Sequence, residues 1–274
     1  QHYGVSQSMS SLLEVLLLGV IQGLTEFLPV SSDGHLAVGQ LLLGMREGNL
    51  TVSVILHGGT LLATALFFQR RLRAIASDFF GSITAPRTLL NQDAGRDAWV
   101  ILLASVPTGI IGLSMKDWVE QWTLSPQVIA PCFLATAALL WSTRSAPVGT
   151  GTTINMSGAL LVGVMQGVAV MPGISRSAAT MAALLWLGVR SERAFELSML
   201  VGLPAVAGAF LLEASHAIPE GQLGADLLAG AAVSFAVGFV ALYLLRGLVT
   251  KRRLFWFSIY LVPLAIGTYA SVYL

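Results

Sequence analysis

The hydrophobic positions of this chain fall into long, nearly uninterrupted apolar segments separated by short polar stretches. A helix needs about 20 apolar residues to cross the hydrocarbon core of a bilayer, and fewer where flanking side chains reach the interface. The pattern therefore predicts six transmembrane helices. They cover residues 52–69, 98–115, 127–143, 195–213, 227–245 and 254–273.

Two further apolar segments, 12–44 and 157–189, have a different pattern because proline and hydroxyl residues interrupt each near its middle. Each segment is long enough for two half-length helices. Irregular backbone at membrane depth is tolerated only where protein buries it or where it lines a cavity. We therefore expect two re-entrant helical hairpins beside the six spans, and an all-α integral membrane protein.

Composition supports a single membrane domain over residues 1–274, with a polar N-terminal tail at 1–11. Charged residues make up only 11% of the chain, against about 25% in soluble domains, and mean hydropathy is +0.77. The net charge of +1 gives no basis for nucleic-acid binding, so membrane lipids are the expected surroundings. A single cysteine, Cys132, excludes an internal disulfide framework.

Basic residues predict the orientation of the chain. With six spans, 12 of the 15 lysines and arginines fall on one side, mostly in the loops 70–96 and 246–253. Only Arg46 and Lys116 fall on the other side, and Arg176 lies inside the second hairpin. The positive-inside rule places the basic side in the cytoplasm.

Each hairpin begins one copy of an internal sequence repeat. Gly19–Gly23 reads G-V-I-Q-G, Gly163–Gly167 reads G-V-M-Q-G, and a proline followed by serines comes after each at a similar distance. Chance matches of G-x-x-x-G also occur in glycine-rich membrane proteins, where the motif allows close helix approach. Here the motif, the proline and the opposite predicted topology agree. We therefore expect inverted-topology repeats, 12–143 and 157–273, with a site where the broken helices meet.

The first hairpin is unusually polar for a membrane-buried segment. A charged side chain at membrane depth costs roughly 3 kcal/mol on insertion scales, so it usually marks a functional site. Glu26 is such a residue, and Gln22 precedes it by one helical turn, on the same helix face. The polar residues of the hairpin are Gln22, Glu26, Ser31, Ser32, Asp33 and His35.

The second hairpin supplies features of an anion site. Its break at Pro172-Gly173 is followed by Ser175, Arg176 and Ser177, and by Thr180 one turn later. A helix N-terminus after a glycine turn favours anions, and a guanidinium can hold a phosphate through two hydrogen bonds. Together the hairpins predict a buried anion site with a carboxylate, a histidine and an oxygen nucleophile.

Each residue also has a purely structural interpretation. Glu26 and Arg176 can form an ion pair without further function, and Ser31, Ser177 and Asp33 can cap helices. His57 lies inside a predicted span, where lining the site and simple packing are equally good explanations.

These motifs resemble those of the undecaprenyl pyrophosphate phosphatase family, also called the bacitracin-resistance family. The residues that carry the resemblance are 22–32 with Gly34-His35, and 172–177. The resemblance implies an enzyme of the bacterial inner membrane, with its active site open to the periplasmic face. It would hydrolyse the C55 isoprenyl pyrophosphate lipid to undecaprenyl phosphate, which returns to peptidoglycan synthesis. A divalent cation, Mg²⁺ or Ca²⁺, would support the activity.

By the same resemblance, the expected catalytic residues are Glu26, Ser32, His35 and Arg176, and Gln22, Ser31 and Ser175 support them. With the polar residues of the chain added, the expected substrate-binding residues are Gln22, Ser31, Ser175, Ser177, Thr180 and His57. The expected metal ligands are Glu26 and Asp33. The chain departs from the family pattern twice. Gln22 stands where the family often has Glu, and Asp33 where it usually has Thr. The first change removes a carboxylate, and Asp33 either restores it or caps the helix.

The sequence leaves several alternatives open. Ser32 can attack phosphorus with His35 or Glu26 as its base, or a metal-bound water can attack instead. Inverted repeats with broken helices also suit a lipid-phosphate flippase or an ion-coupled transporter. The choice between a monomer and a homodimer is not decided by the sequence.

Overall fold

The computed structural model describes residues 12–44, 50–82, 93–217 and 224–272. Over these residues the chain is helical, and the only extended pairing there is one bridge between Gly151 and Val189. The predicted tail at 1–11 and the loop positions Arg46 and Arg87 lie outside the described residues.

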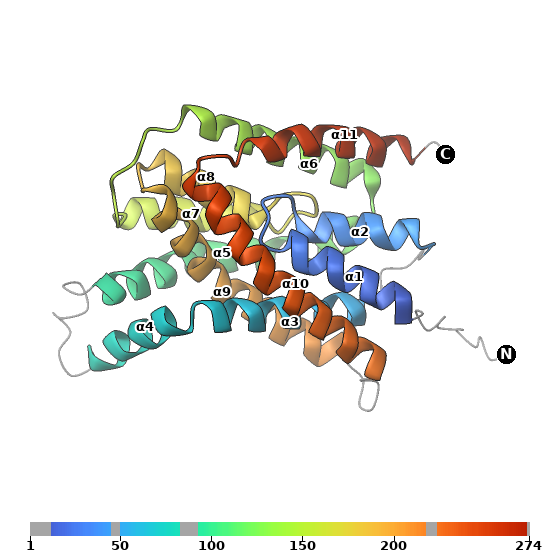
Figure 1. Ribbon diagram of the computed structural model, residues 1–274, viewed down its shortest axis with the longest axis horizontal. Helices are drawn as coiled ribbons and strands as arrows, with labels where there is room; N and C mark the ends of the chain where they lie inside the picture. The colour runs from blue at the N-terminus through green and yellow to red at the C-terminus, as the bar shows by residue number, and fades with distance from the viewer. Residues whose placement is uncertain (1–11, 45–49, 83–92, 218–223, 273–274) are drawn as a thin grey trace.

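Eleven α-helices follow one another in the described chain (Figure 1). The first half contains α1 (Leu12–Thr25), α2 (Ser32–Leu42), α3 (Leu50–Phe67), α4 (Gln69–Gly81), α5 (Asp93–Trp122) and α6 (Pro126–Ser142), which a short 3-10 turn extends over Thr143–Ser145. The second half contains α7 (Met156–Val168), α8 (Arg176–Trp186), α9 (Ser191–Ala217), α10 (Ala225–Thr250) and α11 (Trp256–Ala270).

Four of these helices are long and apolar enough to cross a membrane: α5, α6, α9 and α10. Helices α3 and α4 pass the same test only together, and a bend of 75° separates them. Helix α11, at the last predicted span, has 15 residues, which is shorter than a typical span. The chain is thus an all-helical, multi-pass membrane protein with four or five candidate spans in its described part.

Both predicted hairpins are broken where the sequence indicated. Helices α1 and α2 are separated by the loop 26–31, and α7 and α8 by the loop 169–175. In each hairpin a serine caps the second helix: the Ser31 hydroxyl accepts from the Gly34 amide, and the Ser175 hydroxyl accepts from the Ala178 amide. These caps replace hydrogen bonds that the helix start cannot form internally.

The two G-x-x-x-G motifs pack on helices of the opposite half. A Cβ on Gly19 of α1 would lie 2.7 Å from the carbonyl oxygen of Gly230 in α10. A Cβ on Gly163 of α7 would likewise clash with the carbonyl oxygen of Ala104 in α5. Glycine therefore permits the same backbone approach at both crossings.

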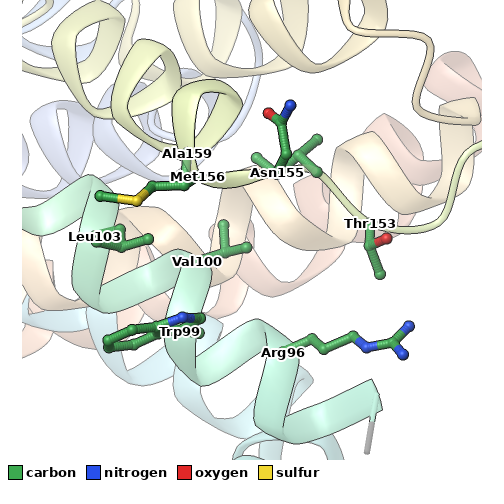
Figure 2. A pocket seen from close by; sticks show the side chains of 9 residues that line it. Arg96, Trp99, Val100, Leu103, Thr153, Asn155, Met156 and Ala159 are labelled. Carbon is green, nitrogen blue, oxygen red and sulfur yellow. The ribbon is translucent and has the colours of Figure 1, made fainter. Parts of the chain in front are cut away.

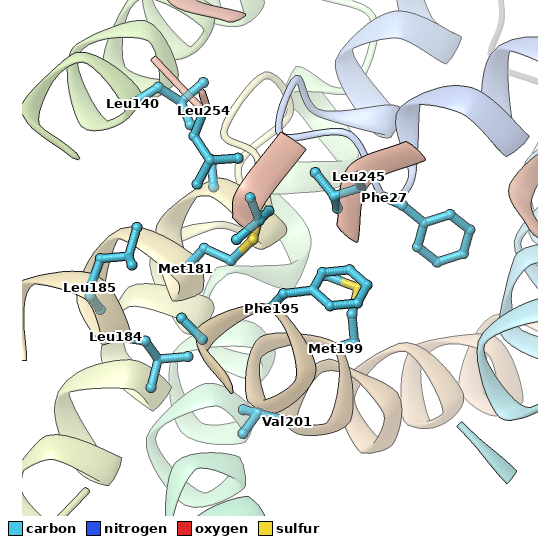
Figure 3. Close-up of a cluster of buried hydrophobic side chains, with 14 of the residues drawn as sticks. Phe27, Leu140, Met181, Leu184, Leu185, Phe195, Met199, Val201, Leu245 and Leu254 are labelled. Carbon is cyan, nitrogen blue, oxygen red and sulfur yellow. The ribbon is translucent and has the colours of Figure 1, made fainter. Parts of the chain in front are cut away.

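One hydrophobic core joins the hairpin tips to the long helices. Phe27, from the first loop, and Met181, from α8, belong to the same buried cluster as Phe195 and Met199 of α9. Figure 3 shows these side chains around the space between α8, α9 and α10. This close packing holds both hairpin loops in one place, where the polar residues gather.

Candidate active site

The loops of the two hairpins contact each other directly. The amide of Gly173 donates to the Ser31 hydroxyl at 3.1 Å, which the left-handed backbone of Gly173 (φ +99°) permits. The Ser177 hydroxyl donates to the carbonyl of Leu28 at 3.4 Å. Residues 150 positions apart therefore share one buried site, as the sequence predicted.

Glu26 is the centre of this site. Its Oε1 accepts from Nη2 of Arg176 at 2.9 Å, and its Oε2 accepts from the Ser32 hydroxyl at 2.8 Å. The same Oε2 accepts from Nε2 of Gln22 at 3.1 Å. The carboxylate is 8% exposed, and these charge-assisted hydrogen bonds make its burial tolerable. We call Glu26, Arg176, Ser32 and Gln22 the Glu26 cluster.

Ser32 and Arg176 hold equivalent places in the two hairpins. Each is the first residue of the second half-helix and follows a capping serine. Each therefore lies at a helix N-terminus, where the backbone amides and the helix dipole favour negative charge. The side chains of both residues contact Glu26, so a ligand anion that replaced this carboxylate would meet the Ser32 hydroxyl and the Arg176 guanidinium.

His57 lines the site. Its Nε2 lies 3.4 Å from Oδ1 of Asp33 and 3.7 Å from Oε2 of Glu26. Its Nδ1 lies 2.8 Å from the carbonyl oxygen of Ser53, which can only accept, so Nδ1 carries a proton. This hydrogen bond fixes the ring and directs Nε2 at the two carboxylates. Of the two interpretations of His57, the structure favours the site.

His35 faces away from the Glu26 cluster. Its Nδ1 donates to the carbonyl oxygen of Ser31 at 2.7 Å, and its Nε2 lies 2.8 Å from the hydroxyl of Tyr260 in α11. Its ring stacks on that of Tyr260 at 5.8 Å. Among the described contacts, Ser32 has Glu26, and not His35, as the base within hydrogen-bond distance.

The remaining predicted residues hold the second hairpin together. The hydroxyls of Ser175 and Ser177 lie 3.1 Å apart, and the hydroxyl of Thr180 lies 2.6 Å from that of Ser198. Thr180 also donates to the carbonyl of Arg176. These hydrogen bonds are structural, and a substrate contact for the three residues stays a prediction.

Sequence reasoning missed Tyr260 and Thr60. The hydroxyl of Thr60, which is buried, accepts from Nε2 of Gln22 at 3.3 Å. Thr60 follows His57 by three residues, so helical spacing could have placed the two together. Tyr260 carries no comparable signal, because it is one of two tyrosines in an apolar helix.

Two buried polar atoms of the site have no hydrogen-bond partner among the described residues: Nη1 of Arg176 and Oε1 of Gln22. Buried polar groups are nearly always paired, so each such atom needs an explanation. The cavity beside Glu26 and Arg176 has a volume of only about 10 Å³, close to the space of one water. This cavity by itself is too small to hold a diphosphate.

Comparison with known proteins identifies the family. The family model described as bacitracin resistance protein BacA matches residues 15–267. The chain belongs to the BacA family. It is 41% identical over 260 residues to a protein of Desulfatibacillum aliphaticivorans. The alignment covers 90% of this chain and 94% of that relative. Proteins of Desulfosudis oleivorans and Desulforapulum autotrophicum are 40% and 39% identical, over 90% and 91% of this chain and 94% of each relative. All three relatives are named undecaprenyl-diphosphatase.

In this BacA-family chain, the two carboxylates of the site fit a divalent cation that is also coordinated by the phosphates of the substrate. The described residues contain no group of three or more His, Cys, Asp or Glu that could bind a metal by themselves. Glu26 and Asp33, however, both have a carboxylate oxygen within 3.7 Å of Nε2 of His57. Magnesium is typically bound through one or two carboxylates together with substrate phosphates, so this donor set fits.

Proposed function

We propose that this chain hydrolyses undecaprenyl diphosphate to undecaprenyl phosphate and inorganic phosphate. The BacA relatives named for this activity cover most of the chain. The observation that carries the proposal is the Glu26 cluster, in which a buried carboxylate contacts a serine and an arginine that are each the first residue of a helix. Flippases and ion-coupled carriers do not need a serine hydrogen-bonded to a buried carboxylate.

Substrate binding and base release are one event in this proposal. Arg176 pairs with Glu26, while Nη1 of Arg176 has no partner in the described chain. The incoming diphosphate accepts hydrogen bonds from both terminal nitrogens of the Arg176 guanidinium and displaces Glu26 from it. The freed carboxylate keeps its contact with Ser32 and becomes its general base.

Phosphoryl transfer then follows in two steps. Glu26 accepts the hydroxyl proton of Ser32 while the serine oxygen bonds to the terminal phosphorus. The bond from this phosphorus to the bridging oxygen breaks, and undecaprenyl phosphate leaves. Water then attacks the phosphoserine, a proton returns to the serine oxygen, and inorganic phosphate is released. Arg176 and the helix N-termini stabilise the charge on the transferred group.

A divalent cation, Mg²⁺ or Ca²⁺, is part of the proposal. Glu26 and Asp33 would be its protein ligands, and the cation would neutralise charge on the diphosphate oxygens. Asp33→Asn should raise the cation concentration that gives half-maximal phosphate release. An unchanged requirement would make Asp33 a cap or a partner of His57 only.

The decisive assay is phosphate release from undecaprenyl diphosphate by purified protein in detergent, where vectorial transport cannot be scored. Ser32→Ala should abolish turnover, and Ser177→Ala, which removes a hydroxyl outside the Glu26 cluster, should leave it measurable. A phosphoserine trapped at Ser32 would support the covalent route. Near-normal turnover of Ser32→Ala would instead favour a metal-bound water as nucleophile.

We extend the proposal to the membrane arrangement: six transmembrane helices and two re-entrant hairpins in inverted repeats, in the bacterial inner membrane, with the site open to the periplasmic face. The matching glycine contacts of α1 and α7 with the opposite halves support the repeat. All residues of the Glu26 cluster come from a single chain, so the proposed chemistry does not require a homodimer.

Single-cysteine labelling tests this arrangement. In a Cys132→Ala background, a cysteine at Glu120 should react with an impermeant reagent from outside the cell, and one at Thr250 should not. Both positions are exposed at helix ends. Labelling of position 250 from outside would overturn the orientation.

A further inference from the structure

A cavity of about 270 Å³ lies between the first turns of α5 and α7, with no lining residue in common with the Glu26 cluster. Figure 2 shows its polar end formed by Arg96 and Thr153, and its apolar end by Trp99, Leu103 and Met156. The cavity is thus amphipathic along its length. An amphipathic ligand would place its charge at Arg96 and its apolar part at Leu103.

The α5 wall has a regular order. Arg96, Trp99, Val100 and Leu103 are spaced i, i+3, i+4 and i+7, so they form one stripe on the helix. Along the helix this stripe runs from a charge through an exposed tryptophan to aliphatic side chains. Charged, aromatic and aliphatic residues follow the same order across a membrane interface, from headgroups to acyl chains.

On the α7 side, the capping residue Asn155 and the apolar Met156 line the cavity. Oδ1 of Asn155 accepts from the amide of Gly158 at 2.9 Å and from the Ser157 hydroxyl at 3.0 Å, so this side chain serves as the helix cap. Met156 follows and is largely exposed. A methionine is flexible and polarisable, which suits a wall against a mobile hydrocarbon chain.

We infer that this cavity binds one phospholipid with an anionic headgroup, from the cytoplasmic leaflet. Arg96 supplies the complementary charge, and Arg96 lies on the side that the excess of basic residues places in the cytoplasm. Basic pockets between membrane helices on the cytoplasmic side bind anionic lipid headgroups in this way. The site is separate from the diphosphate site and does not depend on the proposed hydrolysis.

The test uses full-length protein, stripped of lipid in a neutral detergent. Phosphatidylglycerol or phosphatidylcholine is titrated in, and native mass spectrometry counts the retained lipid while a thermal melt records stabilisation. Phosphatidylglycerol should bind and raise the melting temperature more than phosphatidylcholine. Arg96→Gln should weaken phosphatidylglycerol binding about fivefold, the usual effect of one basic residue at a membrane surface.

Matched variants separate this site from general charge effects. Arg246→Gln removes one exposed charge from the same predicted side, outside the cavity, and should bind phosphatidylglycerol as the wild type does. Leu103→Trp narrows the apolar end while keeping Arg96, and should also reduce the retained lipid. Inorganic phosphate should not displace phosphatidylglycerol from the protein, because it lacks the acyl chain.

Equal retention of both lipids by the wild type, or equal loss in Arg96→Gln and Arg246→Gln, would overturn the inference. Phosphate release is measured on the same preparations without added lipid. Arg96→Gln should keep this basal activity, so failure of the lipid site and failure of the proposed hydrolysis would be seen separately.

Discussion

Two buried carboxylates of this protein pair with arginines, yet their surroundings differ. Asp97 of α5 accepts from Nε and Nη2 of Arg71 at 2.8 and 2.6 Å, and it also pairs with Arg193. Arg193 donates its other nitrogens to Glu196 and to the carbonyl of Thr152. We call these residues the Asp97 cluster. Each guanidinium nitrogen of Arg193 therefore has a partner.

The Glu26 cluster is incomplete by comparison. Nη1 of Arg176 and Oε1 of Gln22 have no partner in the described part of the chain, and one oxygen of Glu26 accepts from a serine hydroxyl. A fully paired buried network specifies and stabilises a structure, whereas each unpaired buried atom needs an explanation such as strain, a catalytic role, a water or an ion. Pairing, and not burial or charge, separates the site from the structural cluster.

The largest expected difference comes from neutralising each carboxylate. Glu26→Gln keeps the side-chain shape but removes the base of Ser32, so phosphate release should fall about 1,000-fold. Asp97→Asn leaves Arg71 and Arg193 without their shared anion and should lower stability by about 3 kcal/mol. Turnover per folded molecule and a thermal melt are measured for both. A catalytic loss in Asp97→Asn without a lower melting temperature would contradict the comparison.

Substitution of Arg176 should mainly reduce activity, and substitution of Arg193 should mainly reduce stability. Arg176→Lys keeps the charge but loses the planar pair of donors, so catalytic efficiency should fall roughly 30- to 1,000-fold. Arg193→Lys in the Asp97 cluster should mainly lower the melting temperature. Steady-state kinetics in detergent measure the loss in Arg176→Lys. Wild-type catalytic efficiency in Arg176→Lys would mean that the two guanidinium donors do not hold the phosphate.

The two glutamines of the repeated G-V-x-Q-G motif allow a finer test. Gln22 donates to Glu26 and Thr60, whereas Gln166 donates to Thr108 and to the carbonyl of Val201. Gln22→Ala should lower kcat about tenfold, the loss of one hydrogen bond to a charged group, with little change in melting temperature. Gln166→Ala should do the reverse. Equal kinetic losses would show that the motif serves structure in both halves.

The smallest expected effect concerns Tyr260. Tyr260→Phe removes the hydroxyl that lies 2.8 Å from Nε2 of His35 and should reduce phosphate release about threefold. The described contacts link the Tyr260 hydroxyl to His35 and not to the Glu26 cluster, so the same change should have no further effect in a His35→Gln background. Additive losses in the double variant would assign Tyr260 a separate role.

Much of the site could be predicted because it is local in sequence. The spacing of Gln22 and Glu26, the break at Pro29 and the serines after it are read directly from one segment. The break at Pro172 and the position of Arg176 are equally local. The pairing of Glu26 with Arg176 followed from the high energy of two isolated charges in a membrane.

The direction of the histidines was not predictable from the sequence. Both His35 and His57 donate from Nδ1 to the carbonyl four residues earlier, a local contact. The tertiary packing decides what Nε2 contacts. Nε2 of His35 lies beside the hydroxyl of Tyr260 from α11, and Nε2 of His57 lies beside the carboxylates of Asp33 and Glu26. Local spacing placed His35 near Ser32, but helix packing directed its ring elsewhere.

The sequence by itself determined the membrane class, the two broken hairpins and the polar residues at their breaks. These depend on hydrophobicity, proline and glycine, which act over a few residues. Only the tertiary structure decided which base contacts Ser32, which histidine lines the site and which buried charges are fully paired. Those outcomes depend on contacts between residues far apart in sequence, such as Ser31 with Gly173 and Arg176 with Glu26, where shifts below one ångström make or break a hydrogen bond.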